Sequence, residues 1–211
     1  MFAATNAQFP DLSPSFYMQG TAVDTTTDGT VITSPRFDIA IDATRELAYI
    51  NSDFIFNGTT FNAFSITSES DNATYSTLTG QNCTMTDGAS MTGQSPIPLT
   101  SNFWDTFENA TEAPPGTFTV ANPPITLSVV IVNGRPTVFT IAVADTGFGG
   151  IVTVITISNY LNGQPPFSLF TLPESCSEFT CDACYSSSAA GLASSLLMML
   201  AAIALFILST V

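Results

Sequence analysis

Apolar and polar residues alternate with a period of two along much of the chain. In residues 37–42 every second residue is a large apolar one, and a similar run extends from Leu47 to Phe56. A strand with one buried face produces this period. The pattern therefore predicts two strands here, joined by a turn at residues 42–45.

Several further segments carry the same strand pattern: residues 61–68, 75–78, 125–131, 137–144 and 151–158. Asn57-Gly58 and Asn133-Gly134 predict tight hairpin turns, because both central residues of such turns need a positive φ. Asp145-Thr146-Gly147 predicts another turn, and short connections favour antiparallel pairing. The strands are long, roughly eight to ten residues against about 5–6 typically, and the chain has 17 Phe. We therefore expect a curved antiparallel sheet whose aromatic residues either fill or line its hollow side.

Two segments between these strands lack the period. Residues 84–100 are rich in Gly, Ser, Thr and Pro and predict a loop. Residues 101–109 predict a short covering helix, capped by Ser101 or Asn102, with Phe103, Trp104 and Phe107 on one apolar face. Pro114-Pro115-Gly116 would end it.

The C-terminal residues 192–211 are apolar and uncharged and follow a run of small residues, 186–191. This is the pattern of a signal for glycosylphosphatidylinositol (GPI) attachment. We expect attachment near Ser187, with 192–211 forming a hydrophobic helix. The alternative is a tail-anchored or single-span protein. The membrane span of such a protein usually has basic residues on its cytoplasmic side.

The chain divides into four expected regions: 1–7, the remnant of a signal peptide in a sequence truncated at its start; 8–176, an extracellular β domain; 177–191, a stalk with the attachment region; and 192–211, the C-terminal signal.

Four Asn-x-Ser/Thr sequons begin at Asn57, Asn72, Asn82 and Asn109. Together with the tail they favour export to the outer side of the plasma membrane, and they predict exposed turns at these residues.

The charge balance excludes several kinds of partner. The chain has three basic residues, 17 acidic ones and a net charge of −14. Binding to nucleic acid or to anionic lipid headgroups requires Lys and Arg, so we expect neither. No spacing resembles a calcium loop, and we expect no metal and no cofactor.

Residues for the common catalytic mechanisms are missing. The chain has no His and no Lys, which excludes Ser-His-Asp and Cys-His nucleophiles and Schiff-base chemistry. Asp38, Asp42, Asp53 and Glu69 lie on polar strand faces and turns, so we expect solvated carboxylates rather than the acid pair of a glycosidase. The Gly-rich residues 147–150 join strands and lack the helix of a phosphate loop. We expect a protein without enzymatic activity.

The cysteines are Cys83, Cys176, Cys181 and Cys184. Four cysteines in an exported chain predict two disulfides with three possible connectivities. Cys181 and Cys184 have no strand–helix context for redox chemistry, so we favour a small structural loop between them. That choice leaves Cys83 to pair with Cys176.

The order of several short motifs resembles the ependymin-related proteins and the eukaryotic domains similar to bacterial lipoprotein-localisation carriers. The motifs are residues 36–42 with Arg45, Tyr75 followed by Cys83, and residues 170–176, which read Phe-Thr-Leu-Pro-Glu-Ser-Cys. The resemblance spans residues 16–176, although basic turns are fewer here and most relatives lack an anchor. It implies a half-open antiparallel β-barrel with helical cover over its mouth, holding a fatty acid or other lipid.

We therefore expect a GPI-anchored surface glycoprotein that binds a hydrophobic ligand on the concave face of its sheet. The expected lining residues are apolar positions of the strands and the cover: Phe37, Ile39, Ile41, Phe54, Phe56, Phe64, Ile66, Trp104, Phe107, Phe139 and Ile141. In the alternative these residues pack on one another and leave no cavity. The protein would then be a coat or adhesion glycoprotein with a protein or glycan partner at the cell surface.

Overall fold

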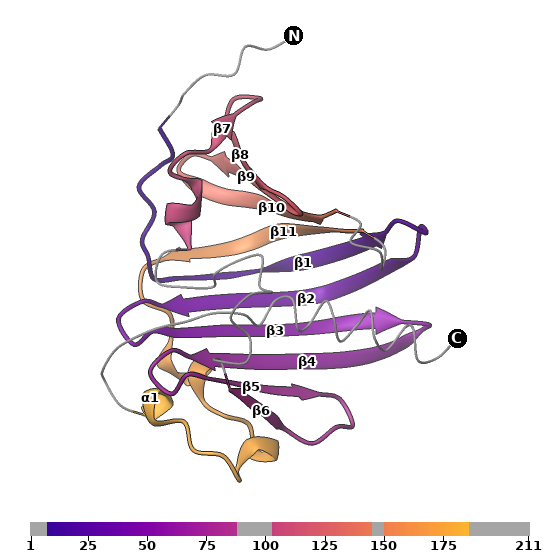
Figure 1. The fold of residues 1–211 in the computed structure, drawn as a ribbon, viewed down its shortest axis with the longest axis vertical. Coiled ribbons are helices and arrows are strands. Elements are labelled where there is room, and N and C mark those ends of the chain that lie inside the picture. Colours follow the sequence, from indigo (N-terminus) through magenta and orange to yellow (C-terminus); the bar gives the residue numbers. More distant parts are fainter. Residues whose placement is uncertain (1–7, 88–102, 145–149, 186–211) are drawn as a thin grey trace.

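Eleven antiparallel strands form one open sheet in the computed structural model (Figure 1). The structure describes residues 8–87, 103–144 and 150–185. The expected signal remnant, the attachment residue Ser187 and the C-terminal signal 192–211 lie outside these residues. Within the described part, no helix has the length and apolarity needed to cross a membrane.

The first six strands follow one another across the sheet as a meander. They are β1 (Phe16–Thr26), β2 (Val31–Asp42), β3 (Leu47–Phe56), β4 (Thr59–Ser68), β5 (Ala73–Leu78) and β6 (Thr84–Asp87). The second meander returns from the opposite edge. Its strands are β7 (Thr111–Glu112), β8 (Thr117–Asn122), β9 (Ile125–Val132), β10 (Arg135–Val143) and β11 (Ile151–Asn162).

The two meanders join where β11 pairs with β1, so the sheet order is β6-β5-β4-β3-β2-β1-β11-β10-β9-β8-β7. Every pairing is antiparallel. Because strand direction alternates across the eleven strands, the edge strands β6 and β7 run in the same direction. The two edges therefore cannot meet as an antiparallel pair, and no pairing joins them among the described strands, so the sheet is open.

The predicted hairpin turns are confirmed. Asn57 and Gly58 connect β3 to β4 with φ values of 49° and 76°, and Asn133 and Gly134 connect β9 to β10 with 52° and 73°. Two consecutive positive φ angles match the right-handed twist of the flanking strands. These turns fix the registers of both hairpins.

Two local predictions were wrong. Residues 84–87 form strand β6, where we expected the start of a loop; the following residues 88–102 are outside the described part. The covering helix expected over 101–109 is not formed: within residues 103–109, the described part of this segment, the structure has only a 3-10 turn, η2 (Trp104–Phe107). Its N-cap, Phe103, provides no side-chain hydrogen bond, and Phe, Trp, Asp and Thr are all weak helix formers.

The two sides of the sheet have separate covers. We call the side that carries Ile39 and Ile41 the inner face, and the side that carries Ala40 and Tyr49 the outer face. Turn η2 packs on the inner face. The C-terminal segment packs on the outer face of β2–β5, through η3 (Phe167–Phe170), η4 (Glu174–Cys176) and the four-residue helix α1 (Asp182–Tyr185) (Figure 1).

Candidate functional site

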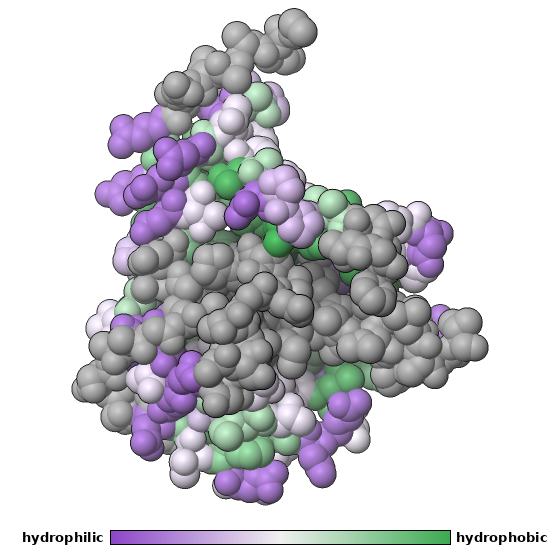
Figure 2. Space-filling model, viewed as in Figure 1, coloured by the Kyte–Doolittle hydropathy of each residue, from purple (hydrophilic) through white to green (hydrophobic). Residues whose placement is uncertain are grey.

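The inner face carries the largest apolar cluster of the described residues. It runs across both meanders, from Ile50 on β3 through Ile39 and Met18 to Phe139 on β10 and Val129 on β9. Inward residues alternate with outward ones on each strand, which is why the period-two pattern appears in the sequence. Figure 2 shows green, apolar residues over β8–β10 on this view of the molecule, with purple, polar residues toward the outer margins.

Aromatic side chains close over the β8–β11 half of the inner face. Trp104 lies 5.0 Å from Phe16, measured between ring centroids, and Phe103 lies 5.7 Å from Phe139. Phe9, from the segment before β1, stacks 5.2 Å from Phe107. These rings contact one another directly, so the cover and this part of the sheet form one packed aromatic cluster.

The structure brings most of the predicted lining residues to the inner face. Phe37, Ile39, Ile41, Trp104, Phe107, Phe139 and Ile141 all belong to the main cluster. Phe54 and Phe56 lie on the same face in a smaller cluster with Ile32 and Ala63.

Phe64 and Ile66 do not line the inner face, so this part of the prediction was wrong. They lie on the outer face, in the cluster covered by Phe170 and the C-terminal segment. Their inward neighbour on β4 is Ser65, which pairs with Ile50 of β3. The apolar side chains did mark buried positions, but the C-terminal segment buries this half of the sheet from the other side.

A buried carboxyl group interrupts the apolar inner face near the β1–β2 turn. Asp24 lies between Ile32 on β2 and Thr153 on β11. Its neighbours Val23 and Thr25 point outward, so its own side chain points to the inner face. The Thr153 hydroxyl donates a 2.6 Å hydrogen bond to Asp24 Oδ1. Burial raises the pKa of the Asp24 carboxyl, and the Thr153 hydrogen bond partly opposes this shift.

Hydroxyl groups line the inner face of β4 and β5. Thr67 and Thr74 are buried and lie 3.2 Å apart, Oγ1 to Oγ1. Ser65 is also buried, and its Oγ has no hydrogen-bond partner among the described residues. The inner face therefore changes from aromatic on the β8–β11 side to hydroxyl-rich on the β4–β5 side.

All three basic residues of the chain lie away from the inner face. Arg36 is on the outer face, where its Nε donates to Asp38 Oδ2 at 2.7 Å. Arg45 lies in the β2–β3 turn, pairs with Asp42 at 2.7 Å and has its guanidinium 4.5 Å from the centre of the Phe167 ring. Arg135 is exposed after the β9–β10 turn. Since the chain has no Lys or His, no cationic side chain reaches the inner face.

The carboxylates that we expected on solvated surfaces are mostly buried. Asp38 and Asp42 have no exposed surface, Glu69 is buried and Asp53 is half-buried. Two arginines and the Tyr17 hydroxyl, 3.2 Å from Asp38 Oδ1, compensate the buried charges. Asp38 and Asp42 are four residues apart on one strand, about 13 Å, which exceeds the spacing of a glycosidase pair.

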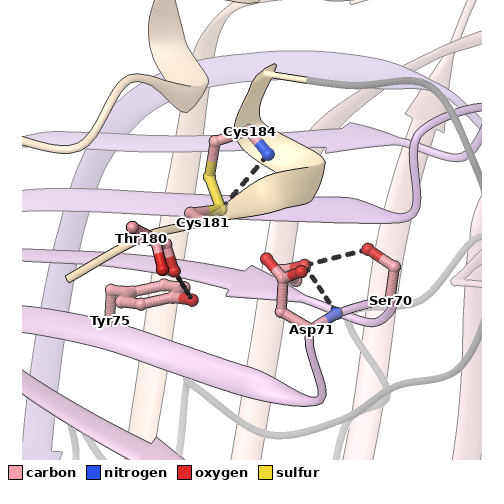
Figure 3. Close-up of a disulfide and its surroundings, with 7 residues drawn as sticks. Ser70, Asp71, Tyr75, Thr180, Cys181 and Cys184 are labelled. Carbon is pink, nitrogen blue, oxygen red and sulfur yellow. Dashed lines mark hydrogen bonds between the residues drawn. A yellow bond between two sulfur atoms is a disulfide. The ribbon is translucent and has the colours of Figure 1, made fainter.

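The two disulfides follow the pairing that we favoured. Cys83 bonds to Cys176 across a sequence separation of 93, and this bond ties the residue just before β6 to η4. Cys181 bonds to Cys184, and both are buried in the outer-face cluster. Figure 3 shows this loop beside Tyr75, whose hydroxyl donates a 2.8 Å hydrogen bond to the Thr180 carbonyl. Up to Cys184, the segment expected as a stalk therefore packs against the sheet.

The four sequon asparagines Asn57, Asn72, Asn82 and Asn109 are all exposed. The described residues contain no group of three or more His, Cys, Asp or Glu side chains placed to hold a metal ion.

No protein-family model matches this chain, and neither does any curated protein. Evidence for the function therefore comes from the geometry and charge of the inner face.

Sequence reasoning missed several inner-face residues, among them Phe16, Met18 and Phe118. Phe118 follows a proline-rich segment on a short strand, and Phe16 and Met18 stand at the start of β1 before a run of small and polar residues. Only Phe16 and Met18 carried a usable signal, because they alternate with Tyr17 and Gln19.

Proposed function

We propose that the protein is a GPI-anchored, non-enzymatic glycoprotein of the outer cell surface that binds an amphiphilic lipid on its inner face. The observation that carries the proposal is an apolar cluster that spans both meanders on the inner face, with the buried carboxyl group of Asp24 at its edge. When the lipid binds, the aromatic cover around Trp104 would give up some of its contacts with the sheet and pack against the hydrocarbon chain of the lipid. The sequons and the C-terminal signal support the surface location.

The charge distribution favours one class of amphiphile. A fatty-acid carboxylate on the inner face would find no cationic side chain, and Asp24 would repel it whenever both were ionised. An ammonium or hydroxyl headgroup can instead donate a hydrogen bond to Asp24. We therefore propose a single-chain amphiphile with a hydrogen-bond-donating headgroup, and the fatty acid that the family resemblance implies becomes the weaker ligand.

The test uses the protein purified from the eukaryotic cells that produce it. Native mass spectrometry detects any lipid that co-purifies, and titrations with decylamine, decanol and decanoate compare three headgroups on one chain. At neutral pH we expect decylamine to bind at least about tenfold more tightly than decanoate, a difference of about 1.4 kcal/mol. The Asp24→Asn variant should lose most of this preference.

A matched control removes an acidic charge elsewhere. Glu178 is exposed on the C-terminal segment, so Glu178→Gln should leave the preference unchanged. Failure of all three amphiphiles to bind would overturn lipid binding itself. Binding of all three with equal affinity would overturn only the role of Asp24.

The alternative function is that of a coat or adhesion glycoprotein with a filled interior. The direct aromatic contacts between Phe103, Phe107 and Phe139 favour it. It predicts a protein that takes up none of the three amphiphiles and binds instead through an outer surface.

A further inference from the structure

The described residues cover half of the outer face and leave the other half uncovered. The C-terminal segment packs over β2–β5. On β8–β11 and the adjoining half of β1, the outward side chains remain exposed or half-buried. We call the outward residues of segments 21–25, 31–33, 117–121, 126–130, 138–142 and 152–156 the Val/Thr face.

Every residue of the Val/Thr face is Thr, Val, Ala or Ser, and none is charged. The register aligns them in rows: Val23 lies opposite Val154 and Thr25 opposite Val152. Val31 is 56% exposed and Val152 is 41% exposed. β-branched residues on adjacent strands produce an even surface on which another sheet can pack.

The absence of charge on this face is unusual for a chain with a net charge of −14. Contact between two copies through the Val/Thr face buries no carboxylate, which matters because each copy is strongly acidic. The sequon residues Asn57 and Asn72 lie in the turns after β3 and β4, and Asn82 and Asn109 also lie off the face. Glycans at these positions would leave the Val/Thr face accessible.

We propose that the Val/Thr face binds the same face of a second copy, forming a two-fold symmetric dimer with two packed sheets. In a two-fold symmetric dimer, the same surface patch of each copy forms the interface, so the patch must be complementary to itself. Aligned sheets pack about 10 Å apart, with Val and Thr side chains interdigitating between them. The dimer does not depend on ligand binding, which takes place on the opposite face.

The size of the face sets the expected strength. Six strands at a spacing of about 4.8 Å span about 24 Å, and three outward residues on a strand cover about 20 Å with their side chains. The footprint of about 500 Å² per partner is at the small end for specific interfaces. We therefore expect a dissociation constant in the micromolar range.

Sedimentation equilibrium of the purified protein over a concentration series tests the proposal. We expect a monomer–dimer equilibrium, and Val154→Glu should weaken it at least about tenfold because the carboxylate would be buried against its symmetry mate. Val132 is 49% exposed at the end of β9, outside the face, so Val132→Glu is the matched control and should dimerise normally. Added salt should strengthen the dimer, because it screens the repulsion between two acidic copies.

Thr25→Lys is a second variant on the Val/Thr face, for the case in which Val154→Glu does not fold. Thr25 is exposed, and this change should weaken the dimer as much as Val154→Glu. A wild-type protein that stays monomeric at all concentrations overturns the proposal. A dimer that both face variants leave intact, or that salt dissociates, also overturns it and indicates a polar interface elsewhere.

Discussion

Gly20 on β1 lies so close to β11 that a Cβ atom added to it would be 2.0 Å from the carbonyl oxygen of Thr156. The pairing of β1 with β11 shifts register at this point, between Gln19 and Gly20. The extra residue on β11, Ser158, donates a 3.1 Å hydrogen bond from its hydroxyl to the Gln19 carbonyl. This bulge lies where the two meanders join, and a bulge increases the local twist of a sheet.

Gly20→Ala should therefore destabilise the protein. The methyl group meets backbone rather than a movable side chain, so β1 must shift away from β11, at a cost of about 1–3 kcal/mol. Thermal unfolding followed by circular dichroism measures the loss. The neighbouring exposed change Thr21→Ala should cost less than about 0.5 kcal/mol; equal effects of the two changes would show that the close approach does not matter.

The long alternating strands were predictable from the sequence, but β1 was not. Gly20, Ala22 and Asp24 face inward on β1, and such small or polar residues give no apolar alternation. The structure shows why they fit: Gly20 meets the β11 backbone, and Asp24 pairs with Thr153. Neither contact follows from local sequence, because each depends on a strand more than a hundred residues away.

The sequence also did not show which side of the sheet each buried apolar residue faces. Ile66 and Ile39 carry the same pattern of burial, yet they point to opposite sides of the sheet. Only the docking of residues 167–184 on the outer face distinguishes them. In the same way Asp38 and Asp42 read as solvated carboxylates until Arg36 and Arg45 are seen beside them.

The Cys83–Cys176 disulfide should contribute far more stability than the Cys181–Cys184 disulfide. In the chain-entropy model, a loop of 93 residues is worth about 4–5 kcal/mol, against about 2 kcal/mol for the short loop. We expect the Cys83→Ser/Cys176→Ser variant to unfold at a much lower urea concentration than the Cys181→Ser/Cys184→Ser variant. Similar midpoints for the two variants would contradict this ranking.

Asp24 should make the stability depend on pH in an unusual direction. Its pKa is raised in the folded protein, so the folded state binds more protons than the unfolded state between about pH 3.9 and the raised pKa. The contribution of Asp24 to stability is therefore favourable at low pH and falls as the pH rises through this window.

The Asp24→Asn variant isolates this contribution, because Asn keeps the shape but does not ionise. At pH 7 we expect the variant to melt above the wild type, by about 2–4 °C for each 1 kcal/mol relieved. Near pH 3.5 the two melting temperatures should converge. A variant that melts below the wild type at pH 7 would show that the ionised carboxylate stabilises the fold.

Trp104 is the only tryptophan of the chain and therefore reports on the aromatic cover without labelling. It is 5% exposed and packs against Phe16 and Phe103. We expect blue-shifted fluorescence that acrylamide quenches weakly in the folded protein and strongly in urea. Decylamine bound on the inner face should alter the emission, because its chain displaces ring contacts of Trp104. Phe103→Ala should cost about 3–5 kcal/mol and increase quenching, whereas strong quenching in the wild type would mean that Trp104 is not held on the sheet.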